Sequence, residues 1–118
     1  MPGLFGWLNT NGNPGNTSAI EVQRRLSEGE QLYLLDVREP DEYRDAYVPD
    51  SVLVPLGQLA YKISDLPRDR PIVALCQTGS RSSVAVSILR RAGFTNVENM
   101  YDGMVSWARS GGPMKSGR

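Results

Sequence analysis

The sequence predicts a small three-layer α/β domain in which helices cover both faces of a parallel β-sheet. Short apolar runs alternate with segments of helical periodicity, and the runs are apolar at nearly every position, as in strands buried on both faces. The chain has 118 residues, 40% of them hydrophobic and 22% charged, which suits one domain with a single core. We expect this domain at 17–113, between a flexible N-terminal arm at 1–16 and a C-terminal tail at 114–118.

Helix caps and apolar runs define the elements of the first half of the chain. A helix begins at a capping box of Ser18 and Glu21 and is stopped by Gly29. The apolar run 32–36 has the length of a buried strand. A proline suited to a first helical turn opens a short helix at 40–45.

The second half continues the alternation of strands and helices. A short strand at 51–55 precedes a helical pattern at 56–66, which ends before a proline. The run 71–75 is a third buried strand, and the amphipathic helix 82–91 is closed by Gly93. The last predicted elements are a strand at 96–100 and a helix at 103–111.

Charge and composition exclude several classes of function. Thirteen basic residues balance thirteen acidic ones, so no overall field favours nucleic acid or an anionic membrane. The chain has one cysteine and no histidine, which excludes an internal disulfide, a CxxC pair and any Cys/His dyad. No segment reads as a signal sequence or a membrane span, and we expect a cytoplasmic protein without a metal or cofactor.

The segment "CQTGSRS", which follows the third strand, is the strongest functional signal. A loop between a strand and a helix N-terminus exposes successive backbone N–H groups, and these form an anion cradle with the positive end of the helix dipole. Gly79 permits a tight bend, and Arg81 adds a permanent positive charge. Cys76 at the start of this cradle is expected to lose its proton below the reference pKa of about 8.5.

Two other interpretations of Cys76 remain open beside the nucleophile that we favour. Free cysteine is often a buried packing residue, and the loop alone could bind an anion with the sulfur incidental. A packing cysteine, however, needs no following glycine, arginine and hydroxyl-bearing residues. The segment "DVREP" follows a neighbouring strand, and its Asp36 and Arg38 are expected to form a structural ion pair near the same opening.

Two long segments resemble the single-domain rhodanese-like sulfurtransferases. They read "LLDVREPDEYRDAYVPDSVLVPLGQL" and "PIVALCQTGSRSSVAVSILRRAGFTNVENMYDGMVSW", and the resemblance covers about residues 18–113. It implies a parallel five-stranded sheet, with the fifth strand a short edge piece before the first helix, and a persulfide on catalytic Cys76. It also implies substrate contacts from the backbone of the loop. The implied substrate-binding residues are Gln77, Thr78, Gly79, Ser80 and Arg81. Beside the resemblance, we expect Asp36, Arg38 and Ser82 to support the loop.

The resemblance also implies a mechanism. The Cys76 thiolate takes the outer sulfur of thiosulfate or of a persulfide and passes it to a small thiophilic acceptor or to a protein. Arg81 either holds the donor anion or braces the loop through a carboxylate, and the sequence leaves both roles open. Because Arg81 is the only charged residue of the loop, thiosulfate is doubtful as the physiological donor.

The sequence departs from the family pattern at one motif. Relatives usually read Gly-His-Ile-Pro-Gly-Ala where this chain reads "AYVPDS". Tyr47 stands in place of the histidine, and Ala46 and Asp50 stand in place of glycines. If the histidine serves only to join segments by hydrogen bonds, the Tyr47 hydroxyl is suited to replace it.

Two alternative functions follow from the same residues. One is a cysteine-dependent phosphatase or arsenate reductase, but related phosphatases of this fold place five residues between cysteine and arginine, whereas four lie between Cys76 and Arg81. The other is a sulfur-carrier or interaction module with little turnover. In that case the apolar cluster of the arm would be its docking element. This cluster consists of Leu4, Phe5, Trp7 and Leu8.

Overall fold

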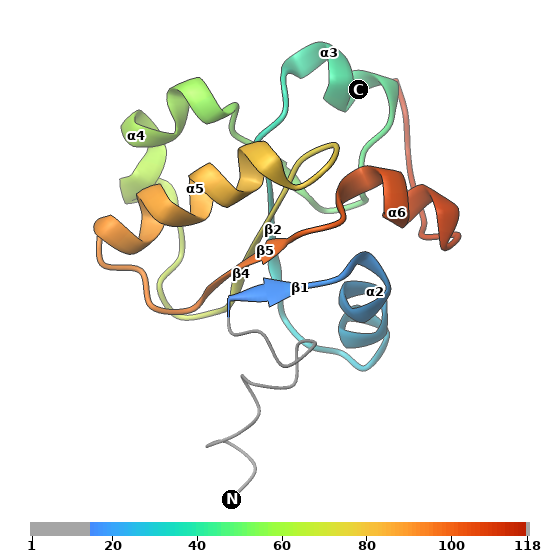
Figure 1. Ribbon diagram of the computed structural model, residues 1–118, viewed down its shortest axis with the longest axis horizontal. Coiled ribbons are helices and arrows are strands. Elements are labelled where there is room, and N and C mark those ends of the chain that lie inside the picture. The colour runs from blue at the N-terminus through green and yellow to red at the C-terminus, as the bar shows by residue number, and fades with distance from the viewer. Residues whose placement is uncertain (1–14, 118) are drawn as a thin grey trace, which may run out of the picture.

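A computed structural model describes residues 15–117 and shows a parallel five-stranded sheet, which confirms the predicted α/β fold (Figure 1). The strand order is β1-β5-β4-β2-β3. Because the strands run parallel, their carboxyl ends lie at one edge of the sheet, where α/β proteins bind ligands. The strands are β1 (Asn16–Thr17), β2 (Tyr33–Asp36), β3 (Val52–Leu53), β4 (Ile72–Leu75) and β5 (Val97–Met100).

The helices follow the predicted order with two differences. The predicted helix at 56–66 is a short α-helix between two 3₁₀ turns, and the predicted helix at 82–91 begins two residues earlier, directly after Gly79. The helices are α2 (Ala19–Ser27), α3 (Pro40–Asp45), α4 (Leu59–Lys62), α5 (Ser80–Arg91) and α6 (Gly103–Arg109), and the turns beside α4 are η2 (Leu56–Gln58) and η3 (Ile63–Asp65).

The edge strands are shorter than the sequence suggested. The predicted strand 51–55 has ladder pairing only at β3, where Val52 is 39% exposed, so it is not covered on both faces as the central strands are. The fifth strand implied by the family resemblance is β1, which pairs with β5 over two residues. Periodicity cannot reveal a strand of two residues, because one period is too short to establish a pattern.

Alternate side chains of the central strands enter two separate cores. Leu34 and Val73 pack with α2 and α6 on one face, while Leu35 and Ala74 pack with α4 and α5 on the other. Figure 1 shows these two pairs of helices on opposite sides of the sheet. The period of two along a strand explains why a continuously apolar run is needed here. Trp107 is fully buried in the core beneath α2 and α6.

The start of α2 is capped by two side chains rather than by a capping box. Ser18 accepts a hydrogen bond from the Glu21 N–H at 3.1 Å, as predicted. The Glu21 carboxylate pairs with Arg24 instead of returning to Ser18. Asp102 supplies the second cap across the fold by accepting from the Ala19 N–H at 2.8 Å. This contact joins the N-terminus of α2 to that of α6.

The structure describes most of the predicted C-terminal tail but only the last two residues of the predicted N-terminal arm. Leu4, Phe5, Trp7 and Leu8 of the predicted arm lie outside the described residues. The predicted tail contacts the domain through backbone bonds: Tyr47 and Lys115 exchange a pair at 2.8 Å each, and Gly117 donates to the Arg44 carbonyl at 2.7 Å. Within residues 15–117, no helix is long and apolar enough to cross a membrane.

Leu35→Ala should destabilise the domain strongly. Leu35 is fully buried in the centre of β2, and a Leu→Ala change in a core costs about 2–5 kcal/mol through lost contacts and the cavity left behind. Urea unfolding measures the change. The control is Tyr61→Ala, since Tyr61 is 84% exposed and its loss should change the free energy of unfolding by less than about 0.5 kcal/mol. Equal effects of the two substitutions would contradict the assigned core.

Candidate active site

The cysteine loop lies at the carboxyl end of the central strands. Cys76 directly follows β4, and Asp36 ends the neighbouring strand β2, where it is in register with Leu75. The Val37 N–H donates to the Leu75 carbonyl at 3.0 Å, so the ladder continues to the start of the loop. The structure therefore brings "DVREP" and "CQTGSRS" side by side, as the sequence predicted.

Hydrogen-bond donors converge on the sulfur of Cys76. The Gly79 N–H lies 3.1 Å from Sγ, and the Ser82 N–H and hydroxyl each lie 3.4 Å from it. Cys76 is fully buried, and burial raises the pKa of its thiol. Hydrogen bonds from the Ser82 side chain and from the amides of Ser82, Thr78 and Gly79 outweigh burial, and the pKa of Cys76 lies below its usual value. The cradle therefore favours the thiolate without a base.

Gly79 gives the loop its shape. It adopts φ of +99° as the N-cap residue of α5, a conformation in which a side chain is strained. A Cβ at this position would overlap the carbonyl oxygen of Tyr101. The Gly79 carbonyl accepts from the Ser83 N–H and from the Asn99 side-chain amide, each at 3.1 Å. These contacts hold the first turn of α5 against the end of β5.

The connection from β5 into α6 holds the other half of the loop. The Cys76 carbonyl accepts from the Met104 N–H at 2.9 Å, and the Gln77 carbonyl accepts from the Val105 N–H at 3.2 Å. Gly103 adopts φ of +67°, and a Cβ there would overlap the Gln77 carbonyl. Because the loop carbonyls are bonded on this side, its N–H groups are free to face the sulfur.

Arg81 is paired with a carboxylate that sequence reasoning did not identify. Its two terminal nitrogens donate to the two oxygens of Glu42 at 2.7 and 2.9 Å. The hydrogen bonds from Arg81 hold the pKa of Glu42 down at about 2. Of the two roles left open for Arg81, the structure shows the contact with a carboxylate. Glu42 lies on α3, and its distance from the loop in sequence hid the pairing.

Asp36 and Arg38 form a buried ion pair beside the loop. Arg38 Nε lies 3.0 Å from Asp36 Oδ1, and its terminal nitrogen lies 2.8 Å from Oδ2. The same guanidinium nitrogen donates to the Ala46 carbonyl at 2.7 Å. The pair therefore fastens the segment after α3 to the end of β2. Both side chains are at most 3% exposed, so the pair lies beneath the surface of the site.

The remaining loop residues face outward. Gln77, Thr78 and Ser80 are exposed, while Ser82 is buried beneath the loop. Contacts of the loop backbone from Gln77 to Arg81 with a substrate remain a prediction. Asn99 and Gly103 hold the cysteine loop in place, but the sequence gives only weak signals of this role. One is an asparagine inside a strand, and the other is a glycine at the start of a helix.

Tyr47 joins its neighbours through its ring and its backbone. The ring stacks on Tyr43 with centroids 4.5 Å apart and an angle of 15° between the planes. Tyr43 in turn donates its hydroxyl to the Ser51 carbonyl at 2.7 Å. The segment that departs from the family motif is thus held by aromatic stacking and by pairing with Lys115.

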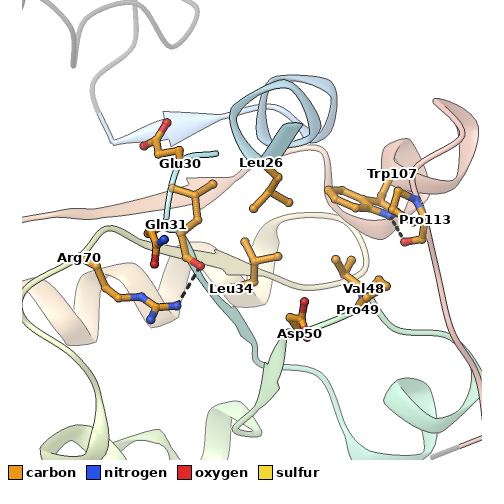
Figure 2. Close-up of a pocket in the computed structure, with 11 residues that line it drawn as sticks. Leu26, Glu30, Gln31, Leu34, Val48, Pro49, Asp50, Arg70, Trp107 and Pro113 are labelled. Carbon is orange, nitrogen blue, oxygen red and sulfur yellow. Dashed lines mark hydrogen bonds between the residues drawn. The ribbon is translucent and has the colours of Figure 1, made fainter. Parts of the chain in front are cut away.

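A pocket lies away from the cysteine. It has a volume of about 520 Å³ and is lined by residues of the α2 and α6 core, including Leu34, Val48 and Trp107 (Figure 2). Arg70 and Asp50 also line it, and no residue of the cysteine loop does. Among the described residues, no group of three or more acidic or cysteine side chains is placed to hold a metal ion.

The fold and the loop define a parallel α/β domain with a cysteine-centred anion cradle. Residues 18–110 match the Rhodanese family, described as a rhodanese-like domain, and the chain belongs to this family. This confirms the resemblance seen in the sequence. The family and its relatives support sulfur transfer as the general class of chemistry.

The similar proteins include one named a sulfurtransferase and one named a putative sulfur carrier. The chain is 33% identical to a sulfurtransferase of Allochromatium vinosum over 79% of its own length and 87% of that protein. It is 34% identical to the putative sulfur carrier protein YrkF of Bacillus subtilis over 72% of its own length, but spans only 46% of YrkF. The solution structure of the rhodanese-like domain of Anabaena Alr3790 has a TM-score of 0.80 at 28% identity, covering 88% of this chain and 80% of that one.

Ser82→Ala should raise the pKa of the Cys76 thiol. The substitution removes a hydroxyl donor that bonds to the sulfur, and loss of a hydrogen bond to the charged thiolate moves the pKa of the thiol upward. Thiolate ultraviolet absorbance, taken as the difference from Cys76→Ser, gives the titration midpoint. Ser83→Ala is the control, because Ser83 is exposed and its side chain does not bond to the sulfur. An unchanged midpoint in Ser82→Ala would contradict the cradle.

Gly79→Ala should destabilise the domain more than Gly111→Ala. Both glycines adopt positive φ, so both substitutions carry a conformational cost of about 1–2 kcal/mol. Only at Gly79 does the added Cβ meet backbone, whereas nothing lies within 4 Å of a Cβ at Gly111. Urea unfolding should therefore show at least about 1 kcal/mol more loss for Gly79→Ala. Equal losses would mean that the loop moves freely away from Tyr101.

Proposed function

We propose that the protein is a sulfurtransferase that carries sulfane sulfur as a persulfide on Cys76. The observation that carries the proposal is the set of three donors within 3.4 Å of the Cys76 sulfur. Donors in this arrangement stabilise an anionic sulfur nucleophile, and they are placed to stabilise the charge of the persulfide in turn. Small-molecule sulfur donors and thiophilic acceptors are the substrates that this chemistry requires.

The reaction proceeds in two displacements on sulfur. The Cys76 thiolate attacks the outer sulfur of the donor, the sulfur–sulfur bond of the donor breaks, and the remaining group leaves with the electron pair. With thiosulfate, Cys76–S⁻ and S–SO₃²⁻ give Cys76–S–S⁻ and SO₃²⁻. A thiophilic acceptor such as cyanide then attacks the terminal sulfur, which restores the thiolate and gives thiocyanate. Neither step requires histidine, which the chain lacks.

Phosphatase or arsenate reductase chemistry of the same fold fits the site less well. The loop is one residue shorter than in related phosphatases of this fold, so its cradle is less suited to the transfer of a phosphoryl group. Arg81, the residue available to hold such an anion, donates both terminal nitrogens to Glu42. Both observations favour transfer of a single sulfur atom.

A sulfur carrier with little turnover is the second candidate function. The relative named a putative sulfur carrier favours it, as does the full burial of Cys76, which slows access by a free small molecule. A protein acceptor would then receive the sulfur. The apolar cluster at Leu4, Phe5, Trp7 and Leu8 is the segment that we would test as its docking element.

The purified protein should gain the mass of one sulfur atom on Cys76 after donor treatment, and Cys76→Ser should not. Mass spectrometry measures the addition, and thiocyanate formation from thiosulfate and cyanide measures turnover. Rapid turnover supports the enzyme, whereas a stable persulfide with negligible turnover supports the carrier. Phosphate release from an aryl phosphate, without sulfur transfer, would overturn both candidates.

A further inference from the structure

We propose that Glu42 is a specificity-determining residue that selects against doubly charged sulfur donors by holding Arg81, so that organic persulfides are the preferred donors. The inference rests on the proposed sulfur transfer and adds the class of donor. It concerns α3, an element to which neither the sequence reasoning nor the family match assigns a part in the reaction.

The first observation is the completeness of the ion pair. Both oxygens of Glu42 accept from Arg81, and Oε1 also accepts from the Glu39 N–H at 2.9 Å. The Glu39 side chain accepts in return from the Glu42 backbone, which completes a capping box at the start of α3. Glu42 is therefore preorganised on its own helix before it meets Arg81. A bidentate pair of this kind has a defined geometry.

The second observation is the distribution of charge around the cysteine. Arg81 is the only charged residue between Cys76 and Ser83, and Glu42 neutralises it. The Asp36–Arg38 pair beside the loop is likewise balanced. The loop thus offers a donor its N–H groups and the helix dipole, but no uncompensated cation. The low pKa of Glu42 keeps this balance throughout the neutral range.

The charge of the donor decides how strongly the Glu42–Arg81 pair disfavours its binding. Thiosulfate brings two negative charges toward a thiolate, and Arg81 must leave Glu42 to meet its sulfonate oxygens. An organic persulfide brings none when it is protonated: Cys76–S⁻ and R–S–SH give Cys76–S–SH and R–S⁻. Arg81 and Glu42 are 35% and 31% exposed, so an anion can reach the pair from solvent and compete for Arg81.

Sulfate binding tests this inference independently of catalysis. Amide chemical shifts of Gly79 and Ser82 are followed by NMR as sodium sulfate is added, against sodium chloride at the same ionic strength. Glu42→Gln removes the charge with little change of shape, and it should lower the sulfate dissociation constant about fivefold. Asp41→Asn is the matched control, because Asp41 is an exposed acid on the same helix. The sulfate dissociation constant of this variant should equal that of the wild type.

A double substitution separates the release of Arg81 from a general loosening of α3. In Glu42→Gln/Arg81→Gln, the gain in sulfate affinity should disappear, because the freed cation is gone. A gain that persists in the double variant, or an equal gain in Asp41→Asn, would overturn the inference. So would failure of Glu42→Gln to bind sulfate more tightly than the wild type.

Turnover then tests the selection of donors. Glu42→Gln should raise kcat/KM about fivefold more for thiosulfate than for an arylthiosulfonate, which carries a single negative charge. A loss of kcat/KM that is equal for both donors would show that Glu42 only supports the structure and does not select the donor. If the wild type forms no persulfide on Cys76 with thiosulfate, with the arylthiosulfonate or with an organic persulfide, the proposed function fails. The sulfate titration would still show whether Glu42 controls the binding of a doubly charged anion at this site.

Discussion

The convergence of peptide N–H groups on a buried sulfur is the constraint on which the site depends. A thiolate removed from water is stable only if hydrogen-bond donors replace its hydration. Gly79 and Ser82 supply these donors from the first turn of α5 and the residue before it. Their direction depends on loop carbonyls that point away from the sulfur, toward Asn99, Met104 and Val105.

Two parts of the chain build this arrangement. The loop itself holds the sulfur and the donors, whereas the connection from β5 into α6 fixes the orientation of the peptide groups. Two glycines allow the layers to approach, because a Cβ at Gly79 or Gly103 would meet a carbonyl of the other segment. The sequence placed Gly103 only at the start of a predicted helix, yet this glycine sets the position of the cysteine loop.

Electrostatics near the cysteine is arranged in balanced pairs rather than as a positive field. Asp36 and Arg38 fasten the end of β2 to the segment after α3, and Glu42 and Arg81 fasten α3 to α5. Charge alone therefore does not attract an anion to the cradle. What remains is the local field of N–H groups, which acts on a sulfur already in place and only weakly at a distance.

The sequence by itself determined the α/β class, the central strands, the nucleophile candidate and its loop, because these depend on local periodicity and on residues next to one another in the chain. Tertiary structure alone decided the two-residue extent and pairing of the edge strand β1, the partner of Arg81 and the anchoring role of Asn99. Glu42 and Arg81 are 39 positions apart, and Asn99 lies 20 positions from Gly79. Contacts of this kind arise only when the parallel sheet brings the carboxyl ends of its strands together, so no local pattern encodes them.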